Sequence, residues 1–263
     1  MKIIWNLLLS LLLGGCMFTD SYSVTDFSTE QQPLIRAIQK GDLEQVKNLA
    51  VTTDLKTLSK RGLPILTVAM YEARNDRNSH KSTPRLDIIT ELMKAGVPFD
   101  QRGEFSDSPL SIALAQEHPA FLEAMLKGGL SPNYIQEYSP IIFDILGNYH
   151  LEHVKILVKY GANINAKDSN GETVAHVGII TSPKISEYLI SIGADIKSEN
   201  KYTHTTFAMD TYKRGLSLKK DIEFLNEHGG NNDLKKMLEE NLIAVKKVKA
   251  IMIERGQKWP PEK

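Results

Sequence analysis

The chain has 263 residues, 41% of them hydrophobic, and its 32 basic side chains balance its 32 acidic ones. This neutrality argues against DNA or RNA as a partner, because nucleic-acid binding needs a basic face that displaces counterions. The length suits one large domain or an array of repeats. The single cysteine cannot form an intramolecular disulfide, so we expect packing to supply the stability.

A short apolar run, Ile3 to Leu13, opens the chain and ends just before Cys16. A helix that spans a bilayer needs about 20 apolar residues, so this run is too short, but it suits the core of a secretory signal peptide over residues 1–15. Residues 13–16, Leu-Gly-Gly-Cys, resemble a bacterial lipobox. The resemblance implies a lipid on Cys16 and, since no aspartate follows it, an outer-membrane anchor facing the periplasm. The alternative is an ordinary signal peptide or a hydrophobic helix with an incidental cysteine.

The next segment, residues 16–32, is polar and contains no lysine or arginine. Segments of this composition near a chain terminus are typically flexible. We therefore predict a flexible tether that holds the folded domain off the membrane surface.

From residue 33 to residue 231 the sequence repeats itself with a period of about 33 residues. Prolines recur where each first helix would begin, and glycines recur where each second helix would end; they are Pro33, Pro64, Pro109 and Pro140, and Gly96, Gly129, Gly161, Gly193 and Gly229. Proline suits the first helical turn because its missing N–H would have no partner there. Glycine supplies the left-handed backbone that ends a helix.

This pattern resembles the ankyrin repeat, which carries T-P-L-H-x-A near its start. The segments NGETVAH, YGANINAKD and IGADIKSEN show the likeness most clearly. The resemblance implies an all-α solenoid of about six helix-turn-helix repeats with hairpin loops, in which each repeat covers the apolar face of its neighbour. It also implies structural roles for His118, His150 and His176. His150 and His153 lie three residues apart and could in principle hold a metal, but we predict no metal site and no cofactor.

Two segments depart from the period. The second repeat carries 12 extra residues near positions 70–85, which we expect to form a loop or an extension of its first helix. After residue 231, apolar residues recur at three- and four-residue steps, which predicts a C-terminal capping helix and tail over residues 232–263. The lysines of this helix, at positions 246, 247 and 249, are interpreted as a solvated face; contact with anionic lipid is the alternative.

The chain contains no G-x-S-x-G elbow, no H-E-x-x-H helix and no glycine-rich phosphate loop. An acylated cysteine is not free to act as a nucleophile, and neighbouring carboxylates such as Glu239 and Glu240 are expected on a solvated helix. We therefore predict that the protein is not an enzyme. A hydrolase with a site built in the insert is the weakest alternative.

The ankyrin resemblance implies that the tips of the hairpin loops, with the exposed side of each first helix, form a concave groove that binds another protein. Tyrosine and arginine dominate such interfaces. The alternative for each aromatic tip residue is packing onto the next hairpin. The tip residues predicted to contact a partner are Arg102, Glu104, Phe105, Asp107, Tyr134, Gln136, Glu137, Tyr138, Lys167, Asn170, Glu172, Lys201, Tyr202 and His204.

A lipid anchor joined to a repeat array is similar to the immunity lipoproteins that protect bacteria from type VI secretion effectors, especially phospholipases. The resemblance implies one protein partner, a secreted toxic lipase, neutralised by covering its active site or its membrane-docking face. It implies membrane contact through the anchor alone, no nucleic acid and no small-molecule substrate. The alternative is a periplasmic scaffold that holds an envelope protein.

Overall fold

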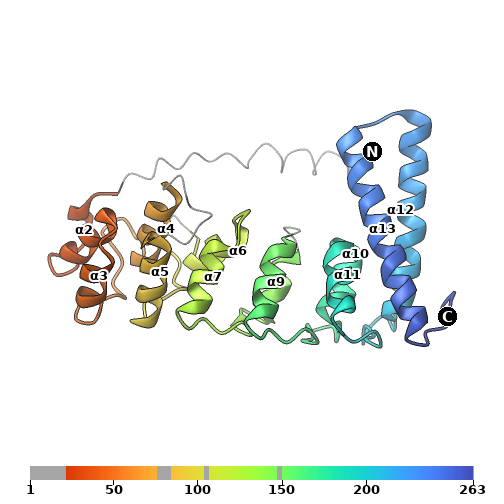
Figure 1. Ribbon diagram of the computed structural model, residues 1–263, viewed down its shortest axis with the longest axis horizontal. Coiled ribbons are helices and arrows are strands. Elements are labelled where there is room, and N and C mark those ends of the chain that lie inside the picture. The colour runs from red at the N-terminus through yellow and green to blue at the C-terminus, as the bar shows by residue number, and fades with distance from the viewer. Residues whose placement is uncertain (1–21, 76–83, 104–106, 147–149, 263) are drawn as a thin grey trace.

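The computed structural model describes residues 22–75, 84–103, 107–146 and 150–262. Successive helices stack side by side in one long row (Figure 1), which confirms the predicted all-α solenoid. In the part of the chain that is described, regular sheet is limited to one antiparallel pair of two-residue strands, in which Ile135 lies opposite Pro140. Cys16, Glu104, Phe105 and residues 76–83 of the predicted insert lie outside the described residues.

The elements follow the chain in a regular order. A 3₁₀ helix, η1 (Val24–Asp26), precedes the array, and two long helices end it. The bounds of the others are α2 (Gln32–Lys40), α3 (Leu43–Ala50), α4 (Ile65–Asn75), α5 (Pro84–Lys94), α6 (Pro109–Ala115), α7 (Ala120–Lys127), β1 (Ile135–Gln136), β2 (Ser139–Pro140), α8 (Ile141–Asp144), α9 (Leu151–Lys159), α10 (Val174–Thr181) and α11 (Pro183–Ser191). The last two are α12 (Phe207–His228) and α13 (Asn232–Glu254).

Local chemistry sets where the helices begin. Pro33 and Pro109 lie in the first turns of α2 and α6, as predicted. The side chains of Ser108, Thr173 and Thr206 accept hydrogen bonds from backbone N–H groups in the first turns of α6, α10 and α12. Each of these caps satisfies a donor that has no partner within its own helix.

Glycine sets where the second helices end. Gly96, Gly129, Gly161 and Gly193 all have positive φ values, between 84° and 109°. L-residues with a side chain rarely adopt this conformation, which confirms the prediction that these glycines close the repeats. The chain then turns into the loop that leads to the next pair of helices.

One apolar core runs the length of the solenoid, from Phe27 near the start to Met252 in α13. Leu122 and Leu189, on second helices of different repeats, have no exposed surface. Because each pair of helices leaves an apolar face uncovered, the core is completed only by the neighbouring pair. On α9 the side chains of Val154 and Leu157 are buried in this core, and residues 156 and 158 are half-buried at its border.

The prediction of a flexible tether over residues 16–32 is wrong for residues 22–32. Phe27 is buried in the core, and the hydroxyl of Tyr22 donates a hydrogen bond to Glu72 of α4. The backbone of Lys60 donates to the carbonyl of Asp26. Two aromatic residues within a polar segment therefore provide enough apolar contact to fix it against the array.

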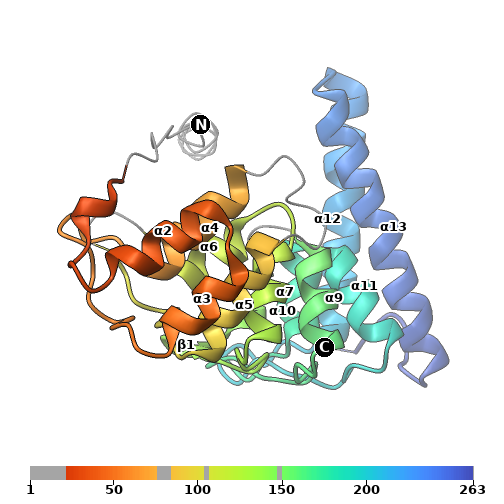
Figure 2. The ribbon, with the colours of Figure 1, turned by 60° about the vertical axis from the view of Figure 1, so that its left-hand side comes forward.

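The C-terminal end also differs from a sixth helix-turn-helix repeat. Residues 207–228 form the single helix α12, which pairs with α13 in a long helical hairpin that rises beyond the array (Figure 2). Gly215 does not interrupt α12, because its backbone keeps a helical conformation. Arg255 ties the hairpin to the array by donating hydrogen bonds to the carbonyls of Ile190 and Ala194 at the end of α11. Among the described residues, no helix combines the length and apolar composition that crossing a bilayer requires.

Candidate protein-interaction surface

The loops between repeats lie along one edge of the solenoid, below the helices in Figure 1. We call this edge, formed by residues 99–103, 107–108, 131–140, 163–173 and 195–206, the loop edge. Each of its last three loops is closed by local pairing: β1 with β2, Lys167 with Thr173, and Glu199 with Thr206. These short pairings give each loop a defined tip.

Asparagine side chains fix neighbouring loops in register. Asn133 accepts a hydrogen bond from the backbone N–H of Asn163 at 2.7 Å, and Asn165 accepts one from the N–H of Asp195 at 2.8 Å. The two asparagines stand at the same place in their repeats, four residues after the closing glycine. This recurring offset is visible in the sequence, but neither asparagine is among the predicted contact residues. They make the loop edge a continuous, pre-organised surface.

Two tyrosines project from this surface. Tyr138 is 92% exposed and Tyr202 is 71% exposed, so neither packs onto the adjacent hairpin. The ammonium group of Lys201 lies 5.0 Å from the centre of the Tyr202 ring, within the range of a cation–π contact. Arg102 and Glu137, from neighbouring loops, form an exposed ion pair at 3.3 Å.

Both loops that carry these tyrosines contain a non-glycine residue with a left-handed backbone. Glu137 has φ 55° and His204 has φ 56°. Such conformations are uncommon without glycine and cluster at functional sites. The imidazole of His204 lies 2.9 Å from the carboxylate of Glu199, within its own loop. Asp107 and Lys167 are also exposed on the loop edge.

Other predicted contact residues are turned inward. Tyr134 donates its hydroxyl to Asp100 at 2.7 Å and packs edge-on against Phe99, and the hydrogen bond to Asp100 raises its pKa. Gln136 is half-buried and donates to Ser111. These two side chains support the loop edge rather than project from it.

Asn170 and Glu172 both make contacts within the array. The carbonyl of Asn170 accepts the backbone N–H of Lys201, which joins two neighbouring loops. Glu172 is only 9% exposed, and its carboxylate lies 3.4 Å from the buried imidazole of His176. The carboxylate of Glu172 is thus held beside His176, four residues further along the chain, and does not project from the tip of the loop.

No family model matches the chain. Human protein phosphatase 1 regulatory subunit 27 is 38% identical over 90 residues, which are 34% of this chain and 47% of that protein. An L-asparaginase of Dirofilaria immitis is 25% identical over 166 residues, 62% of this chain and 26% of that protein. The chain thus spans less than half the length of either relative. The crystal structure of an ankyrin repeat domain from Acinetobacter baumannii AYE covers 82% of this chain and 98% of its own, with 18% identity and a TM-score of 0.49.

Three features recur together along one axis: stacked helix pairs, closing glycines with a left-handed backbone, and a row of hairpin loops. The fold is an ankyrin-repeat solenoid. Ankyrin-repeat arrays generally act as scaffolds that bind other proteins. The asparaginase match covers about a quarter of that enzyme, so it carries no activity over to this chain.

Two histidine clusters lie inside the ankyrin array. The fully buried His176 places Nε2 2.9 Å from Asp210 of α12, while Nδ1 lies 3.1 Å from the hydroxyl of Ser198. Glu172, His176 and Asp210 could together hold a metal ion, since one ligand atom of each lies within 4.8 Å of the others. Hydrogen bonds already account for both ring nitrogens, so the imidazole ties α10 to the terminal hairpin.

The second cluster is the stacked pair His150 and His153, whose ring centres lie 4.7 Å apart. Each ring faces a different carbonyl oxygen at 3.3 Å, that of Leu114 for His150 and that of Ala113 for His153. These carbonyls belong to the last turn of α6, where helical partners are lacking. Burial, aided by the neighbouring His150, lowers the pKa of His153 to about 4. The pair therefore joins α6 to α9.

Proposed function

We propose that this ankyrin-repeat protein binds one protein partner through the loop edge, with Tyr138 and Tyr202 as its anchoring side chains. The observation that carries the proposal is the exposure of both rings on loops whose backbones are held by hydrogen bonds between repeats. A large aromatic side chain on a rigid loop loses little conformational freedom on binding, so it contributes more of its contact energy to affinity.

The charged neighbours of the tyrosines define the kind of surface that would fit. Arg102, Glu137 and Lys201 place both signs of charge around the aromatic tips. Mixed rim charges select the partner and its orientation more than they add affinity. We therefore expect a partner with an apolar depression that receives a tyrosine ring, surrounded by groups of both charges.

We infer the identity of the partner from the N-terminal sequence. The lipobox-like segment ending at Cys16 supports a lipoprotein held at the outer membrane and facing the periplasm. A protein held there is concentrated at the surface where a phospholipase acts, which speeds capture without any new contact. The proposal is that this protein is an immunity protein, which neutralises a type VI secretion effector by covering its active site or its membrane-docking face.

The test of this function is co-expression. The product of the gene next to this one is directed to the periplasm of a bacterial host with and without the full chain, and survival and pull-down are measured. Protection together with a stable complex supports immunity. Unchanged toxicity and no complex refute it, and a complex with a non-toxic envelope protein would instead indicate a scaffold.

Two variants test the binding surface within the same experiment. Replacing both Tyr138 and Tyr202 with alanine should abolish protection while the protein remains folded, because both side chains lie largely in solvent. The matched control is Phe224→Ala, which removes an exposed aromatic ring from the terminal hairpin. Loss of protection in the control, or full protection by the double variant, would show that the loop edge is not the binding surface.

The anchor is tested separately with Cys16→Ser, which removes the sulfur that would carry the lipid. We expect this variant to leave the membrane fraction and to incorporate no labelled palmitate. Protection should weaken but the isolated complex should keep its affinity, because the anchor changes local concentration and not the contacts. Palmitate incorporation equal to that of the parent would contradict the lipoprotein assignment.

A further inference from the structure

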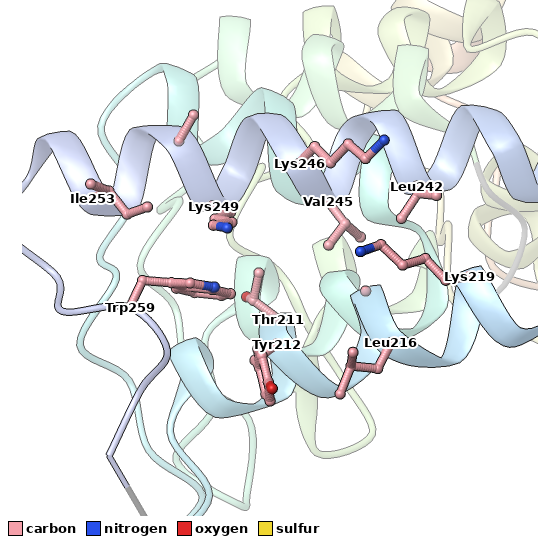
Figure 3. A pocket seen from close by; sticks show the side chains of 12 residues that line it. Thr211, Tyr212, Leu216, Lys219, Leu242, Val245, Lys246, Lys249, Ile253 and Trp259 are labelled. Carbon is pink, nitrogen blue, oxygen red and sulfur yellow. The ribbon is translucent and has the colours of Figure 1, made fainter.

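The terminal hairpin contains a groove that the loop edge does not use. It lies between α12 and α13 at the far end of the array and has a volume of about 470 Å³ (Figure 3). Its apolar lining includes Val245, Leu242 and Ile253 from α13 and Leu216 from α12. Trp259, brought back by the C-terminal segment, closes one end, with its ring 5.8 Å from that of Tyr212.

The position of the groove indicates the shape of its occupant. In the solenoid each pair of helices is covered by the next pair; here α10 packs against α12, and α11 packs against α13. The hairpin stands at the end of the row (Figure 1), so no described helix follows it. Leu216 and Ile253 accordingly remain 50% and 45% exposed. The groove is the place where a further helix would lie.

The charge of the groove indicates the chemistry of that helix. Lys219, Lys246 and Lys249 line it, and its lining includes no acidic residue. Lys249 rests over the Trp259 ring at 5.2 Å, and in Figure 3 the side chain of Lys219 lies between the two helices. Among the described residues, neither Lys219 nor Lys246 forms an ion pair within this chain. An occupant with carboxylates beside an apolar stripe would neutralise all three ammonium groups.

We propose that the groove between α12 and α13 seats an acidic amphipathic helix of a partner protein. A second copy of the hairpin in symmetric contact is disfavoured, since it would bring the same three lysines against one another. A flat lipid surface would reach the exposed side chains of Leu216 and Ile253 but not that of Val245, which is buried. This inference does not depend on the loop edge or on the nature of the partner bound there.

The test uses synthetic helices with a leucine stripe at i, i+3, i+4 and i+7. The probe carries glutamates beside the stripe; one control carries lysines there, and another has the same composition in scrambled order. In a full-length Trp5→Phe chain, Trp259 is the sole tryptophan, so its fluorescence reports occupation of the groove. We expect the acidic helix alone to shift the emission of Trp259 and to bind in an anisotropy titration.

Variants then locate the binding. Leu216→Glu combined with Ile253→Glu, and separately Lys219→Glu combined with Lys246→Glu, should each weaken binding about tenfold or more. The controls Ile243→Glu and Lys220→Glu change exposed residues of the same helices that do not line the groove. They should leave the affinity unchanged, and circular dichroism checks that every variant is folded.

Several results would overturn the inference. These are failure of the acidic helix to bind, equal binding of the lysine or scrambled helix, or equal loss in the control variants. Vesicles of phosphatidylglycerol test whether the groove binds an anionic lipid surface instead. If they shift the Trp259 emission through the groove residues and the acidic helix does not, the groove is a lipid site and the proposal fails.

Discussion

The repeat array and the terminal hairpin are built from helices of different kinds. Array helices such as α6 and α9 have 7 and 9 residues, and α9 packs against α7 on one side and α11 on the other. The hairpin helices have 22 and 23 residues, and α12 buries only four of its side chains. Stacking therefore stabilises the array from both sides of each repeat, whereas the hairpin is supported from one side. The difference leaves apolar surface available on the hairpin.

The largest difference between the array and the hairpin should appear in the free energy of unfolding when a large side chain is truncated in each. Leu122→Ala removes a fully buried side chain from α7 and should lower the free energy of unfolding by about 2–5 kcal/mol. Phe224→Ala, on the exposed part of α12, should change it by less than about 0.5 kcal/mol. Urea titrations followed by circular dichroism measure both. Equal losses would mean that the hairpin carries as much packing energy as the array.

Acid should weaken the array through His153. An unfolded histidine protonates near pH 6.5, and burial lowers the pKa of His153 to about 4 in the folded protein. Between these values the unfolded chain binds one proton more, so stability is full above pH 6.5 and falls as the pH falls toward 4. The loss should be about 3 kcal/mol. In His153→Gln the slope of unfolding free energy against pH should be smaller over this range; an unchanged slope would refute the assignment.

Alanine substitutions at two glycines, one in the array and one in the hairpin, should change the stability by smaller amounts. At Gly128, which ends α7, an added Cβ would lie 2.7 Å from the carbonyl oxygen of Thr90 in α5, so Gly128→Ala should cost about 1–3 kcal/mol. At Gly215, within α12, the nearest atom is a methyl of Val245 at 3.4 Å. Gly215→Ala should therefore stabilise the helix by about 0.5–1 kcal/mol.

Thermal unfolding of the two glycine variants tests whether α12 and α13 are packed more loosely than the helices of the array. The melting temperature should fall for Gly128→Ala and rise for Gly215→Ala. A fall in both would show that α12 and α13 are packed as closely as the helices of the array, and the contrast between the two regions would be lost.

The sequence predicts those parts of the fold that depend on local chemistry. Proline at helix starts and glycine at helix ends act within one turn, so Pro109 and Gly161 could be placed without knowing their neighbours. The single helix α12 could not be predicted in the same way, because a helical repeat unit and one long helix share a similar apolar period. In the structure α12 packs along α13, which lies later in the chain.

The residues of the candidate site also depend on contacts between distant parts of the chain. Tyr134 and Tyr138 belong to one loop and have the same side chain, yet one packs inward and the other is exposed. The difference arises from Phe99 and Asp100 on the preceding loop, which contact Tyr134. Asp100 and Tyr134 are 34 residues apart in the sequence. Contacts between repeats decide which tip residues are available, and a single sequence does not encode them as a pattern.

The central claim is that Tyr138 and Tyr202 anchor a protein partner on the loop edge. The most direct measurement is the dissociation constant of the complex formed with the neighbouring-gene product, compared between the parent chain and the Tyr138→Ala/Tyr202→Ala variant. We predict an affinity at least about a hundredfold lower, since each hot-spot truncation costs about 2 kcal/mol, at an unchanged free energy of unfolding. An affinity equal to that of the parent would contradict the account.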